Sequence, residues 1–495
     1  MNSKTLLQPQ SLALLTDLYQ LTMSYAYWKA GLDKKEAVFH LFFRHYPFDG
    51  GFALTAGLES VIDFLNDFHF SRDDLDYLAT LRGGDNQPLF DAEFFDYLSK
   101  FKFSCDIDAI PEGNVVFPYE PLLRVKGPLV QCQLLESILL NLINFPTLIA
   151  TKAARICNAA QGDPVVEFGL RRAQGIDGAI TASRAAFIGG CTATSNVLAG
   201  KLFGIPVEGT QSHSWVMVFD DEEEAFQVYC QHQPNNGVLL VDTYDTIEGV
   251  RKAIKVGQFL KKQGKKLAGI RLDSGDLAYL SIQSRGLLDA AGFHDTKIIA
   301  SNDLDEAIIS ELKRQHARID TWGVGTNLVT GGSQPALDGV YKLSAIRDAG
   351  ADSEWKYKIK LSEQMIKISN PGILQVKRYM EHGQYVADAI YDINLGVKEP
   401  AMIIDPFDAT RSKTLNKKWE CRELLVPIFR GGKCVYKTPS LPEIQALARE
   451  ELGHFHPSVK RFLNPYAYVV GMEYSLYNLK LKLINDIRTQ AKTTD

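Results

Sequence analysis

Residues 269–276 read Gly-Ile-Arg-Leu-Asp-Ser-Gly-Asp, a short apolar run that ends in polar and turn-forming residues. The same pattern recurs every few tens of residues between about 163 and 346, and a helical stretch follows most runs. This spacing is typical of a β-strand followed by a crossover helix. The seven runs end at 166–169, 187–190, 205–209, 239–243, 270–274, 298–302 and 322–326.

Seven such units predict a parallel sheet. Because no unit stands out as an edge strand, the pattern favours closure into an α/β barrel over an open sheet. Active sites of such barrels lie at the carboxyl ends of the strands. The Gly, Ser, Asp and Thr residues that end these runs are therefore the first candidates for a functional site.

The zones on either side of the repeated units have a different texture. Residues 12–144 mix helical and strand signals with Gly and Pro turns, and the segment from 351 onward combines a strand-like stretch at 355–360 with polar helices. We therefore predict an N-terminal α+β domain over 1–150 and an α/β barrel domain with the active site over 151–346. The remaining segment, 347–495, is expected to complete the α+β domain and to buttress the barrel.

The composition of the 495 residues is that of a folded protein, with 45% hydrophobic, 10% aromatic and 23% charged residues. The net charge of −5 gives no reason to expect general binding to nucleic acid or to a membrane surface. An anionic ligand must therefore be held by a local site.

Targeting and cysteine patterns favour a reduced, cytoplasmic enzyme. The most apolar stretch, 134–150, contains Glu136, Asn141, Asn144 and Pro146, so we expect a buried helix and not a membrane span. Residues 1–30 lack the pattern of a secretory signal. The seven cysteines are scattered, with no CxxC pair, which argues against a disulfide framework and a zinc module.

His213 lies in the segment Gly-Thr-Gln-Ser-His-Ser-Trp at 209–215, just beyond an apolar run. This position at a strand end favours a functional histidine among hydroxyl groups. A histidine that is only hydrogen-bonded in the fold is the alternative, because imidazole is common in interiors as well as in sites.

Arg271 and Asp273 alternate along one predicted strand, which places both on the same face. Arginine binds carboxylate or phosphate with two parallel hydrogen bonds, and aspartate accepts from vicinal hydroxyl groups. The pair suits a ligand that carries an anionic group and a sugar. An internal salt bridge at the rim of the sheet is the alternative.

Three further strand ends carry candidate ligand-binding groups. Phe168 is placed to stack on a planar ring, or it packs in the core. Ser301 and Asn302 offer polar contacts, although such residues also begin helices as N-caps. The glycines and hydroxyls of 322–332 follow the last run, where barrels often bind phosphate through backbone N–H groups.

Five ordered segments of the chain resemble the nicotinate phosphoribosyltransferase family: 16–23, 167–172, 209–214, 271–276 and 323–330. The resemblance implies the type II phosphoribosyltransferase fold, an irregular α/β barrel beside an α+β domain. It implies transfer of the phosphoribosyl group from 5-phosphoribosyl 1-diphosphate to nicotinate, forming nicotinate mononucleotide in NAD salvage. It also implies Mg²⁺ and coupling to ATP through phosphorylation of His213, the reason why the family is classed as a ligase.

The resemblance also assigns roles to individual residues. Tyr19 of a partner subunit and Phe168 would lie on the two faces of the pyridine ring, which implies a homodimer with shared active sites. Arg271 and Thr210 would receive the nicotinate carboxylate, and Asp273 the ribose hydroxyls. The expected phosphate-binding residues are Arg171, Ser301, Asn302, Gly325 and Thr326. Direct Mg²⁺ ligands are not assigned, since diphosphate would carry most of the ion's coordination.

Three alternatives compete with this interpretation. The nicotinamide phosphoribosyltransferases place an aspartate where this sequence has Thr192, and a carboxylate there would repel nicotinate. Quinolinate phosphoribosyltransferases are much shorter and use no phosphohistidine. A non-catalytic nucleotide-binding relative would not need His213, Arg271 and Asp273 together. The residues present therefore favour a catalytic enzyme that acts on nicotinate, without nucleic-acid or membrane partners.

Overall fold

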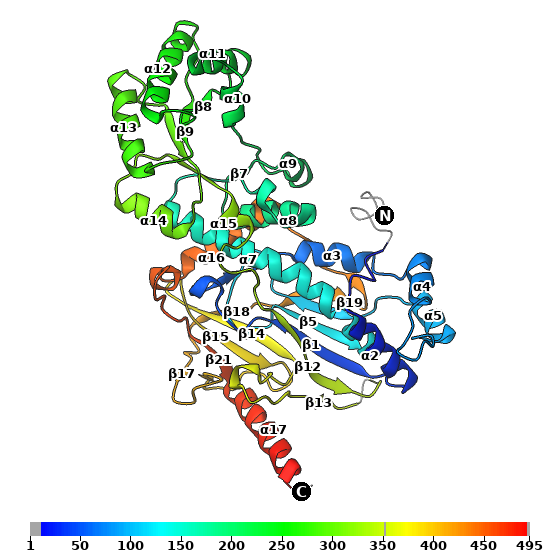
Figure 1. Ribbon diagram of the computed structural model, residues 1–495. Helices are drawn as coiled ribbons and strands as arrows, with labels where there is room; N and C mark the ends of the chain where they lie inside the picture. Colours follow the sequence, from blue (N-terminus) through cyan, green and yellow to red (C-terminus); the bar gives the residue numbers. More distant parts are fainter. Residues whose placement is uncertain (1–10, 351–352, 493–495) are drawn as a thin grey trace. The chain divides into compact units, whose positions relative to one another are not determined.

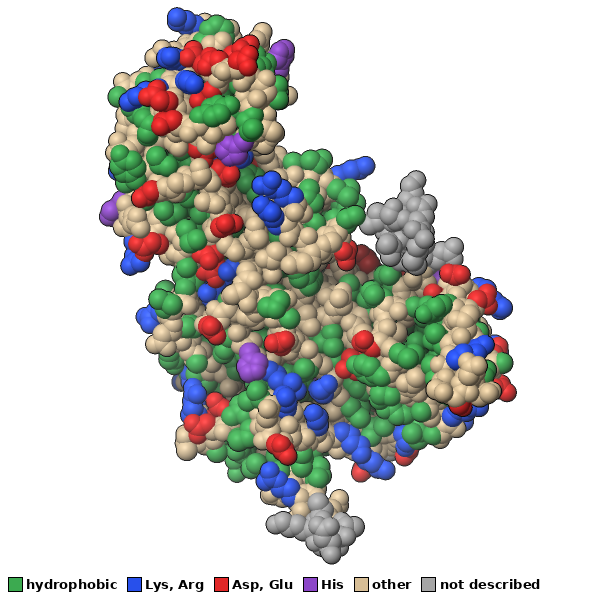
Figure 2. Space-filling view, in the orientation of Figure 1, with side chains coloured by type: hydrophobic (Ala, Val, Ile, Leu, Met, Phe, Trp, Pro, Cys, Tyr) green, Lys and Arg blue, Asp and Glu red, His purple; other side chains and the backbone are tan. Residues whose placement is uncertain are grey.

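The computed structural model describes residues 11–350 and 353–492 and divides into two compact units (Figure 1). Unit 1 combines Met1–Thr147 with Ala336–Asp495, and unit 2 is Leu148–Pro335. On the face in view in Figure 2, acidic and basic side chains are interspersed over the surface.

Unit 2 is built on a six-stranded parallel sheet, and its mixed α/β architecture is confirmed. The strands, in spatial order, are β7 (Ala193–Thr194), β6 (Val165–Glu167), β11 (Thr321–Val324), β10 (Lys297–Ala300), β9 (Gly269–Leu272) and β8 (Val238–Leu240). Every ladder between them is parallel. The apolar runs predicted to end at 166–169, 239–243, 270–274, 298–302 and 322–326 therefore form strands of this sheet. The carboxyl ends of these strands lie at one edge.

The helices of unit 2 follow these strands as the repeated pattern predicts. They are α8 (Gly175–Ile188), α9 (Val197–Phe203), α10 (His213–Met217), α11 (Glu222–His232), α12 (Thr246–Lys262), α13 (Leu277–Ala290), α14 (Glu306–Arg314) and α15 (Thr326–Val329). Asp245, Asp276 and Asp305 cap α12, α13 and α14, each accepting a backbone N–H from the first turn. An aspartate thus ends the strand-to-helix loop in three successive units.

Two of the seven predicted strand ends differ in the structure. Residues 187–190 end helix α8, because the preceding alanine-rich stretch continues as a helix through Ile188. Segment 205–209 contributes only a single bridge, between Thr194 and Val207. Pro206 has no N–H to donate, which limits pairing at this edge.

The predicted closure of the sheet is not confirmed. Among the described residues the ladder runs from β7 to β8 with no strand pairing between these two edges. The segment after Val207 bridges part of the gap: Asn236 Nδ2 donates to the Gly209 carbonyl at 3.1 Å and Gln211 Nε2 to the Val238 carbonyl at 3.5 Å. The barrel remains a prediction.

Unit 1 contains an antiparallel seven-stranded sheet that draws on both the N-terminal and the C-terminal segments. Its order is β13 (Lys356–Tyr357), β12 (Val340–Arg347), β1 (Glu36–Phe42), β5 (Leu123–Pro128), β3 (Asp106–Ala109), β19 (Val426–Arg430) and β20 (Lys433–Cys434). β1 pairs with β12, and β3 pairs with β19. The N-terminal and C-terminal segments therefore share one sheet.

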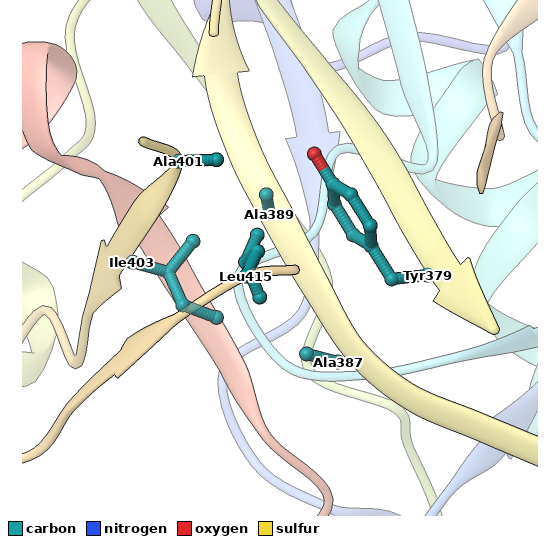
Figure 3. Packing of buried hydrophobic residues seen from close by; sticks show 6 residues of the cluster. All are labelled: Tyr379, Ala387, Ala389, Ala401, Ile403 and Leu415. Atoms are coloured by element: carbon teal, nitrogen blue, oxygen red, sulfur yellow. The ribbon is translucent and has the colours of Figure 1, made fainter. Parts of the chain in front are cut away.

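The second large sheet of unit 1 has six strands, all from the C-terminal segment. Its order is β17 (Ser412–Thr414), β16 (Met402–Ile404), β21 (Val470–Glu473), β15 (Gln384–Asp392), β14 (Leu374–Glu381) and β18 (Glu420–Glu423). Figure 3 shows a buried cluster on this sheet, in which Ile403 and Leu415 face Ala387 and Ala389 of β15. The alanines leave room for the larger side chains, which gives a closely packed core.

Side chains of the seven-stranded sheet hold the first residue of β14. His40 Nε2 accepts from the Leu374 N–H at 3.1 Å, and Arg124 Nη1 donates to the Leu374 carbonyl at 2.7 Å. Burial and the neighbouring Arg124 charge lower the pKa of His40 well below its usual value. His40 is therefore neutral and available as an acceptor, which fixes the two sheets to each other.

The helices of unit 1 complete its surface, together with the short strands β2 (Ala53–Leu54) and β4 (Val115–Val116). They are α2 (Leu18–Lys29), α3 (Leu58–Asn66), α4 (Arg72–Leu78), α5 (Ala92–Ser99), α6 (Leu129–Leu134), α16 (Leu441–His454) and α17 (Tyr474–Lys492), with α7 (Glu136–Ala160) continuing into unit 2. By length and composition α7 passes as a membrane span, but 67% of its most apolar window is buried. That burial is typical of a core helix.

Candidate active site

The carboxyl edge of the parallel sheet in unit 2 gathers most of the predicted site residues. Arg271 lies in β9 and Asp273 follows it, with Arg271 Nη2 4.0 Å from Asp273 Oδ1. His213 Nε2 lies 3.6 Å from Asp273 Oδ2. Arg271 from the same motif and His213 from a separate one therefore both lie beside the Asp273 carboxylate.

Arg271 is held for binding in a largely buried position. Its Nη1 donates to Thr210 Oγ1 and, at 3.2 Å, to the Gln211 carbonyl. Its side chain is only 14% exposed, and its buried Nε donates to no group in the described part of the chain. Burial lowers the pKa of Arg271, and nearby Arg171 lowers it further, while Asp273 and Asp242 oppose that shift. A cation with a spare buried donor is suited to an anionic ligand.

His213 begins helix α10, and both of its ring nitrogens face polar groups. Nδ1 lies 3.2 Å from Thr243 Oγ1, while Nε2 faces Asp273. The helix is anchored by Trp215, whose Nε1 donates to the Ala225 carbonyl at 3.1 Å. The imidazole is 38% exposed, so it is oriented by the fold and remains accessible.

Asp242 was not singled out from the sequence, although it lies within the predicted strand end at 239–243. Its Oδ2 accepts from the Asp273 N–H at 2.7 Å and from Ser274 Oγ at 2.8 Å, and its buried Oδ1 has no partner in the described chain. Asp242 therefore orients the backbone that carries Asp273. The strand-end position was the signal that could have identified it.

Phe168 lies over a surface that only glycine permits. A Cβ on Gly323 would come within 2.5 Å of the Phe168 ring, and one on Gly325 within 3.2 Å of the Phe168 carbonyl. The bend after β6 is fixed by buried Glu167, which accepts from the Gly169 N–H, from Ser183 Oγ at 2.9 Å and from Thr194 Oγ1 at 2.6 Å. The half-buried Phe168 ring is thus placed at the carboxyl edge.

Ser301 lies beside Arg271, Asp273 and His213 at the carboxyl edge. The alternative interpretation, that Ser301 caps the following helix, is wrong. Its Oγ donates to Asp273 Oδ1, and Asp305 caps α14 instead. Asn302 follows with a positive φ of 123° and an exposed side chain. Ser301 therefore supports the carboxylate, while Asn302 is open to solvent or ligand.

The loop after β11 places Gly325 and Thr326 at the same edge. Gly325 precedes the four-residue helix α15, and the loop continues through Gly331 and Gly332, both with positive φ. Arg171 is exposed on the turn after Phe168. These residues line the strand ends on the side of β6 and β11.

Two residues from the sequence interpretation lie elsewhere. Tyr19 belongs to unit 1, where it lies on α2 and is 49% exposed. Burial, with Glu136 and Asp17, raises the pKa of Tyr19. Thr192 precedes β7 and bonds through its N–H to Val165 at the start of β6, so it lies at the amino ends of the strands. The residue that follows β7 at the carboxyl edge is Ser195.

A metal site made by protein alone is not present in the described residues, which contain no group of three or more His, Cys, Asp or Glu placed to hold an ion. The edge offers two carboxylates, Asp242 and Asp273. Mg²⁺ in phosphate-transferring sites is commonly held by one or two carboxylates together with substrate phosphates and water. The donor set fits that arrangement.

Family models match nearly the whole chain in three consecutive parts. They are the nicotinate phosphoribosyltransferase N-terminal domain over 14–144, the nicotinate phosphoribosyltransferase family over 164–368 and its C-terminal domain over 374–480. The chain belongs to the nicotinate phosphoribosyltransferase family. The resemblance stated from its five segments is therefore confirmed.

Individual members of the nicotinate phosphoribosyltransferase family are similar to this chain over more than nine-tenths of their length. The chain is 41% identical to the Bacillus subtilis nicotinate phosphoribosyltransferase, covering 97% of this chain and 96% of the relative. It is 37% identical to the Caenorhabditis elegans enzyme, covering 96% and 92%. The crystal structure of human nicotinic acid phosphoribosyltransferase has a TM-score of 0.80 and 32% identity, covering 95% and 100%.

A more distant structure shares the fold. The nicotinate-nucleotide pyrophosphorylase of Pyrococcus furiosus matches with a TM-score of 0.67 at 23% identity, covering 92% of this chain and 97% of that one. The structure therefore matches the family's type II phosphoribosyltransferase fold, with the N- and C-terminal domains present.

Proposed function

We propose that the protein transfers the 5-phosphoribosyl group from 5-phosphoribosyl 1-diphosphate to nicotinate, with ATP hydrolysis coupled through phosphorylated His213, in cytoplasmic NAD salvage. The observation that carries the proposal is the convergence of Arg271, Asp273 and His213 at one strand edge. Family membership and the matching relatives support the nicotinate substrate.

Nicotinate would bind with its carboxylate against Arg271. The buried Nε of Arg271 lacks a partner in the described chain, and Thr210 Oγ1 already orients the guanidinium. The pyridine ring would lie on Phe168, held in place above Gly323. The ring nitrogen is an unprotonated nucleophile near neutral pH, so binding has only to position it.

The phosphoribosyl donor would occupy the adjoining part of the edge. Asp273 accepts from the ribose hydroxyls, and Ser301 and Asp242 hold that carboxylate and its backbone in place. Arg171, Asn302, Gly325 and Thr326 offer donors to phosphate oxygens. Asp242 or Asp273, together with the diphosphate, would hold Mg²⁺, and the ion would supply charge stabilisation for the leaving group.

The reaction forms one bond at ribose C1 and breaks another, and these side chains stabilise the charges that develop. The nicotinate nitrogen forms a bond to ribose C1 while the C1–oxygen bond to diphosphate breaks, and the electron pair leaves with the diphosphate. The transition state carries positive charge at C1, which the Asp273 carboxylate stabilises nearby. Arg171 faces the departing negative charge.

The energy coupling runs through His213. One imidazole nitrogen attacks the γ-phosphorus of ATP, ADP leaves with the electron pair, and water later takes the phosphoryl group as inorganic phosphate. Asp273 beside Nε2 and Thr243 beside Nδ1 orient the ring.

Phosphorylation of His213 is tested by incubating the protein with ATP labelled at the γ-phosphate. The wild type should acquire an acid-labile, base-stable label that chases on addition of both other substrates, and His213→Ala should acquire none. His294→Ala is the matched control, because His294 is an exposed histidine of the same unit that pairs with Asp289. Equal labelling of His213→Ala and wild type would reject the phosphohistidine.

The site is completed by Tyr19 from a second copy in a homodimer. Tyr19 is half-exposed at the start of α2, beside the exposed apolar residues Leu15 and Leu18. Such a patch is suited to burial against another chain. An aromatic ring on the second face of the pyridine would add stacking to that from Phe168.

A further inference from the structure

A cavity of about 660 Å³ lies entirely within unit 1, apart from the residues assigned to catalysis. Its walls come from residues 44–46 after β1, from 118–119, from the 405–413 loop between β16 and β17, and from 466–471 leading into β21. Small-molecule sites typically have volumes of about 300–1,000 Å³. The cavity is therefore large enough for a nucleotide.

The floor of the cavity is rigid. Ile403 lines it and also belongs to the packed cluster of Figure 3. The 405–413 loop is closed by its own bonds: the Asp405 N–H donates to the Arg411 carbonyl at 2.9 Å, and Asp405 Oδ1 accepts from the Phe407 N–H at 2.9 Å. The wall residues are thus held in position before any ligand binds.

Positive charge exceeds negative charge among the lining residues. Arg44, Arg411 and Lys413 are present, and Asp405 is the one carboxylate among them. Asp405 lies 3.6 Å from Arg411, and Lys413 Nζ donates to the Val386 carbonyl. Arg44 is different: in the described part of the chain its Nε is buried and donates to nothing, and no carboxylate pairs with it. Since an unpaired buried donor is costly, an anion at Arg44 would remove that cost.

Aromatic rings surround this unpaired cation. Tyr119 packs against Phe407 with ring centroids 4.8 Å apart, and Arg44 is close enough to lower the pKa of Tyr119 against the stronger effect of burial. Tyr466 lines the cavity and is 58% exposed at the surface. A free cation beside accessible rings is suited to a ligand with a phosphate and a planar base.

We propose that this cavity is a nucleotide-binding site distinct from the catalytic edge, in which Arg44 binds the phosphate and Tyr466 stacks on the base. An acidic peptide would satisfy Arg44 but leave the aromatic wall unused. The proposal does not depend on the reaction at His213, since no residue is shared between the two sites.

The test is calorimetric binding of adenosine monophosphate, adenosine and inorganic phosphate to the full-length protein. Adenosine monophosphate should bind more tightly than either fragment. Arg44→Met and Tyr466→Ala should weaken its binding, Arg44→Met by at least about tenfold, the loss expected for one charge-assisted hydrogen bond. Arg271→Met, at the catalytic edge, is the matched control and should leave this affinity unchanged.

Three results would overturn the proposal. They are an affinity for adenosine monophosphate that survives Arg44→Met, an affinity that is lost only in Arg271→Met, and phosphate alone binding as tightly as the nucleotide. Thermal melting verifies that each variant is folded. If Arg44→Met does not fold, Arg44→Lys keeps the charge but loses the paired donors, and it should still weaken binding.

Discussion

Arg271 and Asp273 leave β9 on the same face, with Arg271 Nη2 4.0 Å from Asp273 Oδ1 and each held by a different neighbour. Thr210 accepts from the arginine, and Ser301 donates to the aspartate. Because each side chain has its own support, the two do not neutralise each other in a close salt bridge. A cation for the substrate acid and an acceptor for the ribose are thereby presented side by side.

Arg271→Met should lower kcat/KM for nicotinate at least roughly tenfold, because a charge-assisted hydrogen bond contributes about 1.5–3 kcal/mol. The reaction with nicotinamide, which has no carboxylate, should lose less. Arg251→Met is the control, since Arg251 pairs with Glu248 on the surface of α12. Equal losses for both substrates would assign Arg271 to the phosphoribosyl group.

Gly323→Ala should displace Phe168 without unfolding the protein. The new Cβ would lie 2.5 Å from Phe168 Cε2 and 2.6 Å from Phe168 Cδ2, so the half-buried ring must turn away from the strand. Lost stacking predicts a rise in KM for nicotinate of about two- to twelvefold, from 0.5–1.5 kcal/mol per aromatic pair. Gly286→Ala in α13 has open space around its Cβ and should leave KM unchanged. A large fall in melting temperature with unchanged KM would contradict the assigned role of Phe168.

Tyr19 in trans is tested by complementation between two inactive variants. Tyr19→Asp should repel nicotinate, and Asp273→Ala should lose the ribose contact. Mixing them with subunit exchange should restore about one quarter of wild-type activity, because half of randomly formed dimers carry one intact site of two. Heterodimers that form without recovering activity would place Tyr19 outside the partner's site.

We expect Lys480 in α17 to make the free energy of unfolding depend on pH. It is 5% exposed, its Nζ donates to Asn370 Oδ1 at 2.9 Å, and burial lowers its pKa to about 8. In the unfolded chain the pKa is about 10.4. Between these values the unfolded state binds more protons, so the contribution of Lys480 to stability rises with pH in that window.

The comparison between wild type and Lys480→Met isolates this contribution. Between pH 7 and pH 10.5, the free energy of unfolding of the wild type should rise by roughly 3 kcal/mol more than that of Lys480→Met. This figure follows from about 1.4 kcal/mol per unit of pKa difference. Lys482→Met, at an exposed position of the same helix, should show no such gain. Parallel pH curves for wild type and Lys480→Met would show that Lys480 is not a buried charge.

The strands that carry the site were predictable because short apolar runs ending in polar residues have few other interpretations. Residues 187–190 show the limit: an apolar run at the end of a buried helix has the same local composition as a strand. The position of Asp242 at a predicted strand end was readable, but its role depends on the Asp273 N–H, a tertiary contact that no local pattern encodes. Thr192 was named by resemblance alone, and its place at the amino end of β7 depends on a backbone contact with Val165 that residue types do not encode.

The choice of acceptor substrate shows most directly whether the protein is a phosphoribosyltransferase that prefers nicotinate. Product formation should be measured in parallel for nicotinate, nicotinamide and quinolinate, each with 5-phosphoribosyl 1-diphosphate and Mg²⁺, with and without ATP. We expect nicotinate mononucleotide as the main product, a higher rate with ATP, and much lower kcat/KM for the other two acceptors. A kcat/KM for nicotinamide equal to or above that for nicotinate would contradict this expectation.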